Sequence, residues 1–205
     1  MGVTIITTSD GSHSLLNTEM DETYHSIHGA VQESQHVFIK NGLDAISLDE
    51  VNIFEVGFGT GLNALLAATS NRKINYTTIE AFPLEESVYS QLNYLPQELL
   101  LELHRNHRFE TQNFKFEKIH ATLQSIVLDP IYNIVFFDAF APNKQPEMWE
   151  LPMIEKVCNA LTPGGLFVTY CAKGQLKRDL KSLGMEVETL PGPPGKKEMV
   201  RGTKK

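Results

Sequence analysis

From Val51 onward, short apolar runs alternate with amphipathic segments. Such runs are typical of strands buried on both faces, and the segments between them have helical periodicity. Strands are predicted at 51–57, 74–82, 114–120, 132–138 and 165–172, and helices at 61–70, within 84–101, and at 121–128, 146–161 and 174–184. The alternation predicts an α/β fold with a doubly wound, mostly parallel sheet. Residues 185–190 and 196–202 are expected to close the chain as an antiparallel pair.

The first fifty residues follow a different pattern. Two short β segments flank Asp10-Gly11, a strong tight-turn signal, and residues 30–42 are predicted to form a helix ending at Gly42. We therefore expect residues 1–50 to be a hairpin and helix extension and residues 51–205 to be one compact unit. The extension is expected to fold over the ligand site as a lid.

The stretch EVGFGTGLN, which begins at Glu55, places three glycines between a strand and a helix. Gly57 permits a tight turn, Gly59 allows a ligand to approach the backbone, and Gly61 eases helix packing. Glu80 ends the next strand, where a carboxylate accepts both hydroxyl groups of a ribose. S-adenosylmethionine and NAD both suit this arrangement, and Glu55 favours the cationic ligand over a pyrophosphate.

Ligands of a doubly wound sheet bind beyond the carboxyl ends of its strands. Gly57, Glu80, His120, Asp138 and Tyr170 are therefore expected on one rim. The alternation thus predicts a single site that draws its residues from several strands.

Asp138 ends an apolar strand and is followed by Ala-Phe-Ala-Pro. A carboxylate at this rim can hold the N–H groups of an amine and stabilise the positive charge that develops during methyl transfer. Phe140 can stack on a flat substrate, and Pro142 limits the flexibility of the segment. The alternative is that Asp138 only caps the turn into the next helix, but its place at the rim favours the functional interpretation.

Charge is unevenly distributed along the chain. Residues 1–154 carry 8 Lys/Arg and 20 Asp/Glu, whereas residues 155–205 carry 10 and 5. The basic C-terminal stretch is either a solvated terminus or a surface for a phosphate backbone, and charge alone does not decide. Lys144 is likewise either a phosphate contact or a solvated lysine. No apolar run approaches the roughly 18–20 residues of a membrane span, and we see no secretory leader.

His25, His28 and His36 have a spacing that would allow a zinc site, but no cysteine or carboxylate cluster completes a tetrahedral set. We expect no metal and assign these histidines to packing beneath the lid or to contacts near the substrate. Cys158 and Cys171 are expected to be free buried thiols in a reducing compartment.

Several stretches together resemble one known family. The stretches EVGFGTGLN, FFDAFAPNKQPEMW, LTPGGLFVTYCAKGQLKRDL, TSDGSHSLLN and PGPPGKKEMV are similar to the methyltransferase half of the tRNA 5-methylaminomethyl-2-thiouridine biosynthesis bifunctional proteins. The resemblance covers nearly the whole chain and implies a seven-stranded class I, Rossmann-like methyltransferase sheet. It also implies methyl transfer from S-adenosylmethionine to the 5-aminomethyl nitrogen of wobble (2-thio)uridine in the tRNA anticodon stem-loop.

The resemblance also implies roles for particular positions, with Asp138 as the catalytic acid. The expected cofactor-binding residues are Glu55, Gly57, Gly59, Thr60, Gly61, Asn63, Glu80, Ala81 and Ala121. The expected substrate-binding residues are Tyr24, Ser26, Glu33, Phe140, Pro142, Lys144, Lys196 and Lys197. The family often has an acid near adenine where this chain has His120-Ala121, which leaves that contact open.

Because 205 residues leave no room for the FAD-dependent oxidase half, we expect the stand-alone form of the methyltransferase. We expect a cytoplasmic enzyme without membrane, metal or obligate protein partner. A small-amine methyltransferase or aminopropyltransferase would share the fold and the loop, and it suits the acidic N-terminal part. A nicotinamide-dependent oxidoreductase fits less well.

Overall fold

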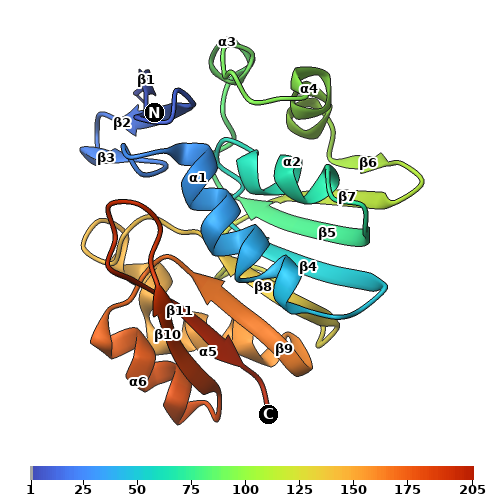
Figure 1. Cartoon of the computed structure of the whole chain (residues 1–205), viewed down its shortest axis with the longest axis vertical. Helices are drawn as coiled ribbons and strands as arrows, with labels where there is room; N and C mark the ends of the chain where they lie inside the picture. Colours follow the sequence, from blue (N-terminus) through green and yellow to red (C-terminus); the bar gives the residue numbers. More distant parts are fainter. Residues whose placement is uncertain (1) are drawn as a thin grey trace.

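The centre of the computed structural model, which describes residues 2–205, is an eight-stranded sheet. Its strand order is β10-β11-β9-β8-β4-β5-β7-β6, and helices cover both of its faces (Figure 1). The strands are β4 (Glu50–Val56), β5 (Lys73–Glu80), β6 (Arg108–Glu110), β7 (Phe114–His120), β8 (Tyr132–Phe137), β9 (Leu161–Thr169), β10 (Glu186–Pro191) and β11 (Glu198–Thr203). The α-helices are α1 (Ala30–Ser34), α2 (Leu62–Ala68), α3 (Glu86–Tyr89), α4 (Gln97–Arg105), α5 (Leu151–Asn159) and α6 (Gly174–Ser182).

The doubly wound, mostly parallel sheet is confirmed, with eight strands in place of the expected seven. The additional strand, β6, pairs antiparallel with β7 at one edge of the sheet. The closing antiparallel pair is also confirmed, because β10 pairs with β11 along its whole length.

Strand register brings the expected site residues to one edge. β4 pairs in parallel with β5 on one side and with β8 on the other, so that Val56 lies opposite both Ile79 and Phe137. The residues that follow these three are Gly57, Glu80 and Asp138. They therefore lie side by side at the carboxyl ends of β4, β5 and β8, where the strand order of the sheet reverses. This is the usual ligand position in such folds.

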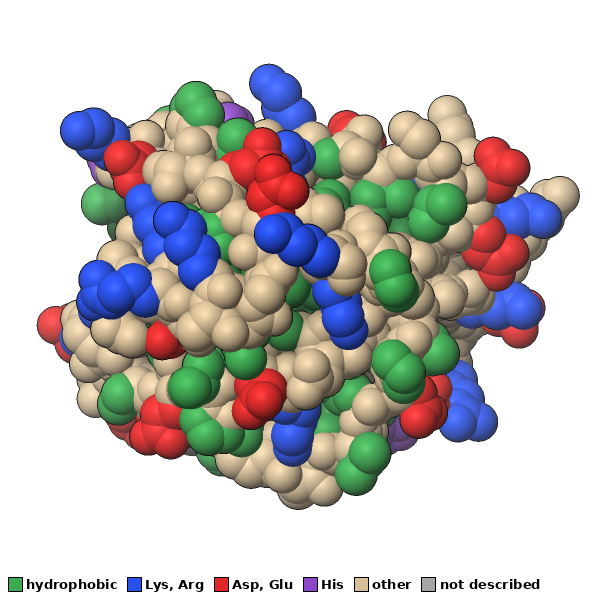
Figure 2. Space-filling model, turned by 90° about the horizontal axis from the view of Figure 1, so that it is seen from below, with side chains coloured by type: hydrophobic (Ala, Val, Ile, Leu, Met, Phe, Trp, Pro, Cys, Tyr) green, Lys and Arg blue, Asp and Glu red, His purple; other side chains and the backbone are tan. Residues whose placement is uncertain are grey.

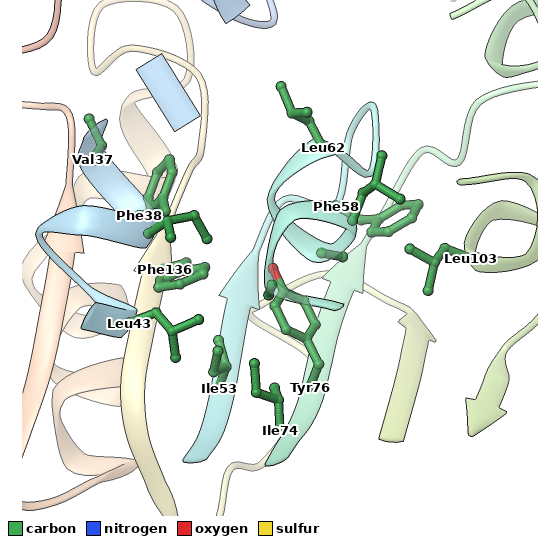
Figure 3. Packing of buried hydrophobic residues seen from close by; sticks show 14 of the residues in the cluster. Val37, Phe38, Leu43, Ile53, Phe58, Leu62, Ile74, Tyr76, Leu103 and Phe136 are labelled. Atoms are coloured by element: carbon green, nitrogen blue, oxygen red, sulfur yellow. The ribbon is translucent and has the colours of Figure 1, made fainter. Parts of the chain in front are cut away.

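Alternate residues of the central strands pack on opposite faces of the sheet. Ile53 and Phe136 belong to the cluster beneath α1 and α2, and Phe54 and Phe137 belong to the cluster on the α5 face. Figure 3 shows the first cluster, in which the rings of Phe38 and Phe136 lie 5.1 Å apart. These two packed layers hold the strand ends in fixed positions.

The N-terminal extension is a three-stranded antiparallel sheet followed by a helix. Its strands are β1 (Val3–Thr7), β2 (His13–Asn17) and β3 (Glu22–Thr23), so the predicted hairpin is confirmed and has a third strand. Asp10 holds the turn, because its carboxylate accepts hydrogen bonds from Thr8 and Ser12. The predicted helix begins as α1, continues as a π-helical turn over Gln35–Lys40 and is followed by a 3₁₀ turn over Leu43–Ala45.

Residues 121–128 form turns, and the helix predicted there is wrong. The reason is a tertiary contact: Lys156 Nζ from α5 donates to the carbonyls of Leu123, Gln124 and Ile126 at 2.8, 3.1 and 3.0 Å. Backbone acceptors satisfied in this way do not need helical partners.

The predicted helix 146–161 is divided into two parts. A 3₁₀ turn over Pro146–Trp149 is followed by extended backbone at Glu150, and α5 then begins ahead of Pro152. Proline has no N–H to donate to the carbonyl four residues earlier, so Pro152 fits in the first turn of α5 but not inside a continuous helix, which accounts for the break. β9 also begins earlier than predicted, at Leu161, because Gly164 and Gly165 pair with Lys204. In residues 2–205 no helix is both long and apolar enough to span a bilayer.

Candidate active site

A cavity of about 670 Å³ opens at the carboxyl ends of β4, β5 and β8. Residues 22–28 of the N-terminal extension, the loops after the strands and the turn between β10 and β11 form its wall. The expected site residues in this wall are Tyr24, Ser26, Glu33, Gly57, Gly59, Thr60, Glu80, Ala81, Ala121, Asp138, Phe140 and Lys196. The structure thus brings most of the predicted residues together around one space.

The glycine loop has the geometry that its sequence pattern predicts. Gly57, Gly59 and Gly61 have φ values of +88°, +52° and +75°, a region that strongly favours glycine. A Cβ at Gly57 would lie 2.8 Å from the carbonyl oxygen of Asp138. The loop is tied to the next strand because the Gly59 N–H donates to Glu80 Oε2 at 2.8 Å. Glycine therefore lets the two site-bearing loops touch.

The part of the cavity wall around Glu80 has groups that suit an adenosyl group. Glu80 Oε1 accepts a hydrogen bond from the Phe82 N–H at 2.8 Å, so both carboxylate oxygens are held in position while the side chain stays in the wall. Ala81, Phe82 and Ala121 provide apolar surface on the same side. A carboxylate that accepts from the ribose hydroxyl groups, beside apolar residues that contact the base, is the arrangement that an adenosyl group requires. His120 lies outside the wall, with Nε2 3.2 Å from the Ala81 carbonyl oxygen.

Asp138 is the carboxyl group at the centre of the site. Its Oδ2 accepts a hydrogen bond from Asn63 Nδ2 at 2.8 Å. Burial raises the pKa of Asp138 to about 7, and the charge of Glu33 acts in the same direction. The Asn63 amide and the Lys196 ammonium oppose this shift. A carboxyl group with this pKa exchanges a proton near neutral pH, as a general acid or base must.

Glu33 and Lys196 form a partly buried ion pair in the cavity wall. Lys196 Nζ lies 2.6 Å from Glu33 Oε1 and 3.8 Å from the centroid of the Tyr170 ring. Glu33 Oε2 also accepts a hydrogen bond from the Ser26 N–H at 2.7 Å. The pair joins α1 of the extension to the turn between β10 and β11, next to Asp138.

Aromatic side chains shape the space beside Asp138. Tyr24 and Phe140 meet edge to face with centroids 4.9 Å apart. The Phe140 backbone is held by Trp149, whose Nε1 donates to the Phe140 carbonyl at 2.7 Å. Tyr170 Oη donates to the Ala139 carbonyl at 2.8 Å, which fixes the backbone next to Asp138. These contacts hold a flat, partly apolar surface close to the carboxyl group.

The remaining predicted site residues lie outside the cavity wall. Gly61 belongs to the glycine loop and Glu55 and Asn63 flank the loop in the sequence, but none of the three lines the cavity. Pro142, Lys144 and Lys197 do not line it either. Lys144 Nζ donates to the carbonyls of Met20 and Asp21 at 2.8 and 2.9 Å. It therefore ties the DAFAP loop to the N-terminal extension.

Glu55 is fully buried, and burial raises its pKa to about 8. It is therefore mostly protonated at neutral pH and presents no charge to a ligand in the cavity. The sequence argument that Glu55 selects a cationic ligand is not supported by this position.

Sequence reasoning missed several wall residues, among them Phe82, Gln124 and Gly195. Gly195 has a φ of +84° and lies directly against the His28 ring, so the turn between β10 and β11 closes on the extension. The PGPPG stretch signalled a turn, but nothing in the sequence indicates that this turn reaches a segment so distant along the chain.

The three N-terminal histidines serve separate contacts. Buried His25 has Nε2 2.7 Å from Thr60 Oγ1, and burial lowers its pKa to about 4. His36 Nε2 lies 2.8 Å from the Pro191 carbonyl oxygen, and His28 packs on Gly195. Throughout residues 2–205, no group of three or more His, Cys, Asp or Glu side chains is arranged to hold a metal ion.

The basic C-terminal part does not form one continuous positive surface on the face that Figure 2 shows, where Lys and Arg side chains lie among acidic ones. Lys177 pairs with Glu198 at 2.9 Å and Arg201 with Glu188 at 2.9 Å. Lys204 donates to backbone carbonyls. Part of the C-terminal positive charge is therefore already used within the protein.

The sheet order, the glycine loop with Glu80 and the adjoining cavity define the class as a Rossmann-like methyltransferase. Residues 86–205 match a family described as S-adenosyl-L-methionine-dependent methyltransferase. The chain belongs to this family, and the expectation of S-adenosylmethionine in place of NAD is confirmed. The family does not support the oxidoreductase alternative.

Curated relatives named tRNA 5-methylaminomethyl-2-thiouridine biosynthesis bifunctional protein MnmC cover most of this chain. The one from Marinomonas sp. is 28% identical over 91% of this chain and 32% of its own length. The one from Idiomarina loihiensis is 30% identical over 91% and 36%. The family resemblance seen in the motifs is thereby confirmed, and the chain spans about a third of the length of these relatives.

Solved structures share the fold. MNMC2 from Aquifex aeolicus superposes with a TM-score of 0.83 and 24% identity, over 98% of this chain and 70% of that one. A spermidine synthase in complex with a transition state analogue superposes with a TM-score of 0.59 and 11% identity, over 95% and 70%. At these identities the comparison supports the fold alone.

Proposed function

We propose that this protein transfers a methyl group from S-adenosylmethionine to the 5-aminomethyl nitrogen of wobble (2-thio)uridine in tRNA. The observation that carries the proposal is Asp138, a partly buried carboxyl group in the cavity wall with a pKa of about 7, beside the aromatic surface of Tyr24 and Phe140. The names of the relatives from Marinomonas and Idiomarina support the choice of substrate.

Asp138 has the properties that methylation of an amine requires. A primary amine is mostly an ammonium ion at neutral pH, and it must lose a proton before its lone pair can attack. Ionised Asp138 accepts this proton, and the buried site holds the nitrogen in line for attack. When bound, S-adenosylmethionine supplies the methyl group from its sulfonium, so the N–C bond forms as the C–S bond breaks and the electron pair stays on sulfur.

The aromatic surface suits a base taken out of a loop. Sequence-specific RNA recognition uses unstacked loop bases, which stack on aromatic side chains. We propose that Phe140 and Tyr24 contact the uracil ring and that residues 1–50 act as a lid over the unit 51–205. The seven wall residues at 22–28 support the lid proposal, because they close the cavity from the side of the extension.

The proposed partner is the tRNA anticodon stem-loop, and the proposed location is the cytoplasm, where tRNA is modified. Lys196 and Lys197, in the turn between β10 and β11, would attract the phosphate backbone. Affinity for tRNA should then fall as salt concentration rises. Equal affinity at low and high salt would contradict this electrostatic contribution.

A small-amine transferase is the second candidate. The likeness of the fold to spermidine synthase favours it, as do the carboxylates Glu22, Glu33, Glu80 and Glu147 in the cavity wall. Such groups could bind the ammonium ends of a polyamine.

One set of parallel reactions separates the two candidates. The enzyme is incubated with labelled S-adenosylmethionine and either tRNA carrying 5-aminomethyluridine or a mixture of di- and triamines, followed by nucleoside and amine chromatography. A parallel reaction with decarboxylated S-adenosylmethionine tests aminopropyl transfer. Label in 5-methylaminomethyluridine alone supports the proposal, and label or aminopropyl groups on amines alone would overturn it.

A further inference from the structure

Glu55 is a carboxyl group in the core that the proposed chemistry does not use. It lies at the end of β4 beneath the glycine loop and has no exposed surface. Its Oε2 accepts a hydrogen bond from Thr78 Oγ1 at 2.7 Å, whereas its Oε1 has no hydrogen-bond partner. An ionised carboxylate with one buried oxygen unpaired is unfavourable. A proton on Oε1 neutralises the charge and turns the unpaired acceptor into a hydrogen-bond donor.

Asn63 connects this carboxyl group to Asp138. Its Nδ2 donates to Asp138 Oδ2 at 2.8 Å. The same amide lies close enough to Glu55 to oppose the rise in its pKa. Asn63 Oδ1 and Tyr76 Oη are buried without a partner, as is Glu55 Oε1. The Tyr76 hydroxyl is one donor for these three atoms, and a proton on Glu55 would supply a second. The Asn63 amide is thereby free to keep its N–H on Asp138.

We propose that Glu55 is a positioning residue that stays protonated throughout the working pH range and, through Asn63, leaves the negative charge at this edge of the sheet to Asp138. The inference rests on the proposed function, because it assumes that Asp138 handles the proton of an amine. It extends that function by assigning a role to a residue that touches neither cofactor nor substrate.

The surroundings of both carboxyl groups agree with this order of ionisation. Glu55 is faced by Thr78 and Tyr76 from β5, by Asn63 from α2 and by Asp138; burial is the largest cause of its raised pKa, and the charge of Asp138 adds to it. Asp138 is faced in addition by Glu33 from α1, Lys196 from the turn between β10 and β11, and Tyr170. Lys196 stabilises ionised Asp138.

A direct test titrates the carboxyl carbons of the full chain by ¹³C NMR, without any methyl acceptor. Glu55→Gln and Asp138→Asn assign the two signals. The expected result is a Glu55 carboxyl that is still protonated at pH 7 and ionises above Asp138. A Glu55 signal that is ionised at pH 6, or that titrates below Asp138, would overturn the proposal. Because no acceptor is present, this outcome is independent of whether tRNA is the substrate.

The kinetic test is the pH midpoint of the methylation rate. If Glu55 is neutral in the wild type, Glu55→Gln leaves this midpoint in place, because no charge is removed. Asn63→Leu, which deletes the donor to Asp138, should raise the midpoint by about one pH unit and so lower the rate at acid pH about tenfold. A midpoint that falls by about one unit in Glu55→Gln would mean that Glu55 was ionised and would contradict the assignment.

Discussion

The partly buried ion pair between Glu33 and Lys196 should make a measurable contribution to stability. Removing one partner of a fully buried pair costs about 3–5 kcal/mol, because the other charge stays desolvated. The Glu33 side chain is 7% exposed but that of Lys196 is 33% exposed, so solvent screens the pair in part. We therefore expect Lys196→Met to lower the free energy of unfolding by about 2 kcal/mol, which also includes the lost contact with the Tyr170 ring. Glu33→Gln should cost about 1 kcal/mol, since its amide oxygen can still accept from the Ser26 N–H.

A double-mutant cycle by urea unfolding tests this reasoning. The double variant should be less destabilised than the two single variants together, with a coupling energy of about 1 kcal/mol. The exposed pair Arg108–Glu117, with side chains 81% and 45% exposed, is the matched control and should show no measurable coupling. Strict additivity at Glu33 and Lys196 would refute the claim that the extension and the turn between β10 and β11 are held together by this pair.

Three further variants address the core, the loop and the buried acid. The wild type should lose stability as pH rises from about 4.5 through 8, because the raised pKa of Glu55, from 4.5 to about 8, means that the native state keeps a proton that the unfolded chain releases. Glu55→Gln should remove the contribution of Glu55 to this loss, roughly 4–5 kcal/mol, whereas the contribution of Asp138, whose pKa is raised from 3.8 to about 7, remains. An unchanged pH dependence in urea unfolding would be the contrary result. Gly57→Ala should weaken cofactor binding in calorimetry, since its Cβ would lie 2.8 Å from the Asp138 carbonyl oxygen, whereas Gly164→Ala, with a similar φ and open space, should not. Phe136→Ala should lower the free energy of unfolding by about 3–5 kcal/mol, and a loss below about 1 kcal/mol would mean that the cluster in Figure 3 repacks.

The arrangement of Gly57, Glu80 and Asp138 was predictable from local sequence. Each follows an apolar run long enough for one buried strand, and parallel strands end at a common edge. Fixed geometry of this kind needs no knowledge of distant contacts. Six of the nine expected cofactor-binding residues and five of the eight expected substrate-binding residues line the cavity.

Contacts between distant segments were not predictable. Lys196 contacts Glu33 across 163 positions, and Lys156 of α5 donates to the carbonyls of Leu123, Gln124 and Ile126. The same limit explains Lys144, whose sequence position after the DAFAP motif suggested a phosphate contact but whose ammonium binds the backbone of the extension. Long flexible side chains find partners only after the fold has formed, so sequence spacing carries little information about them.

Methyl transfer to tRNA from cells that lack this protein tests the central claim most directly. Labelled S-adenosylmethionine is supplied to the wild type and to Asp138→Asn, and cofactor affinity is measured for both. We predict label in wobble 5-methylaminomethyluridine with the wild type, and a rate about 10²–10³ lower with Asp138→Asn at similar cofactor affinity. Unlabelled tRNA from a wild type that binds the cofactor, or an Asp138→Asn variant with full activity, would contradict the assignment.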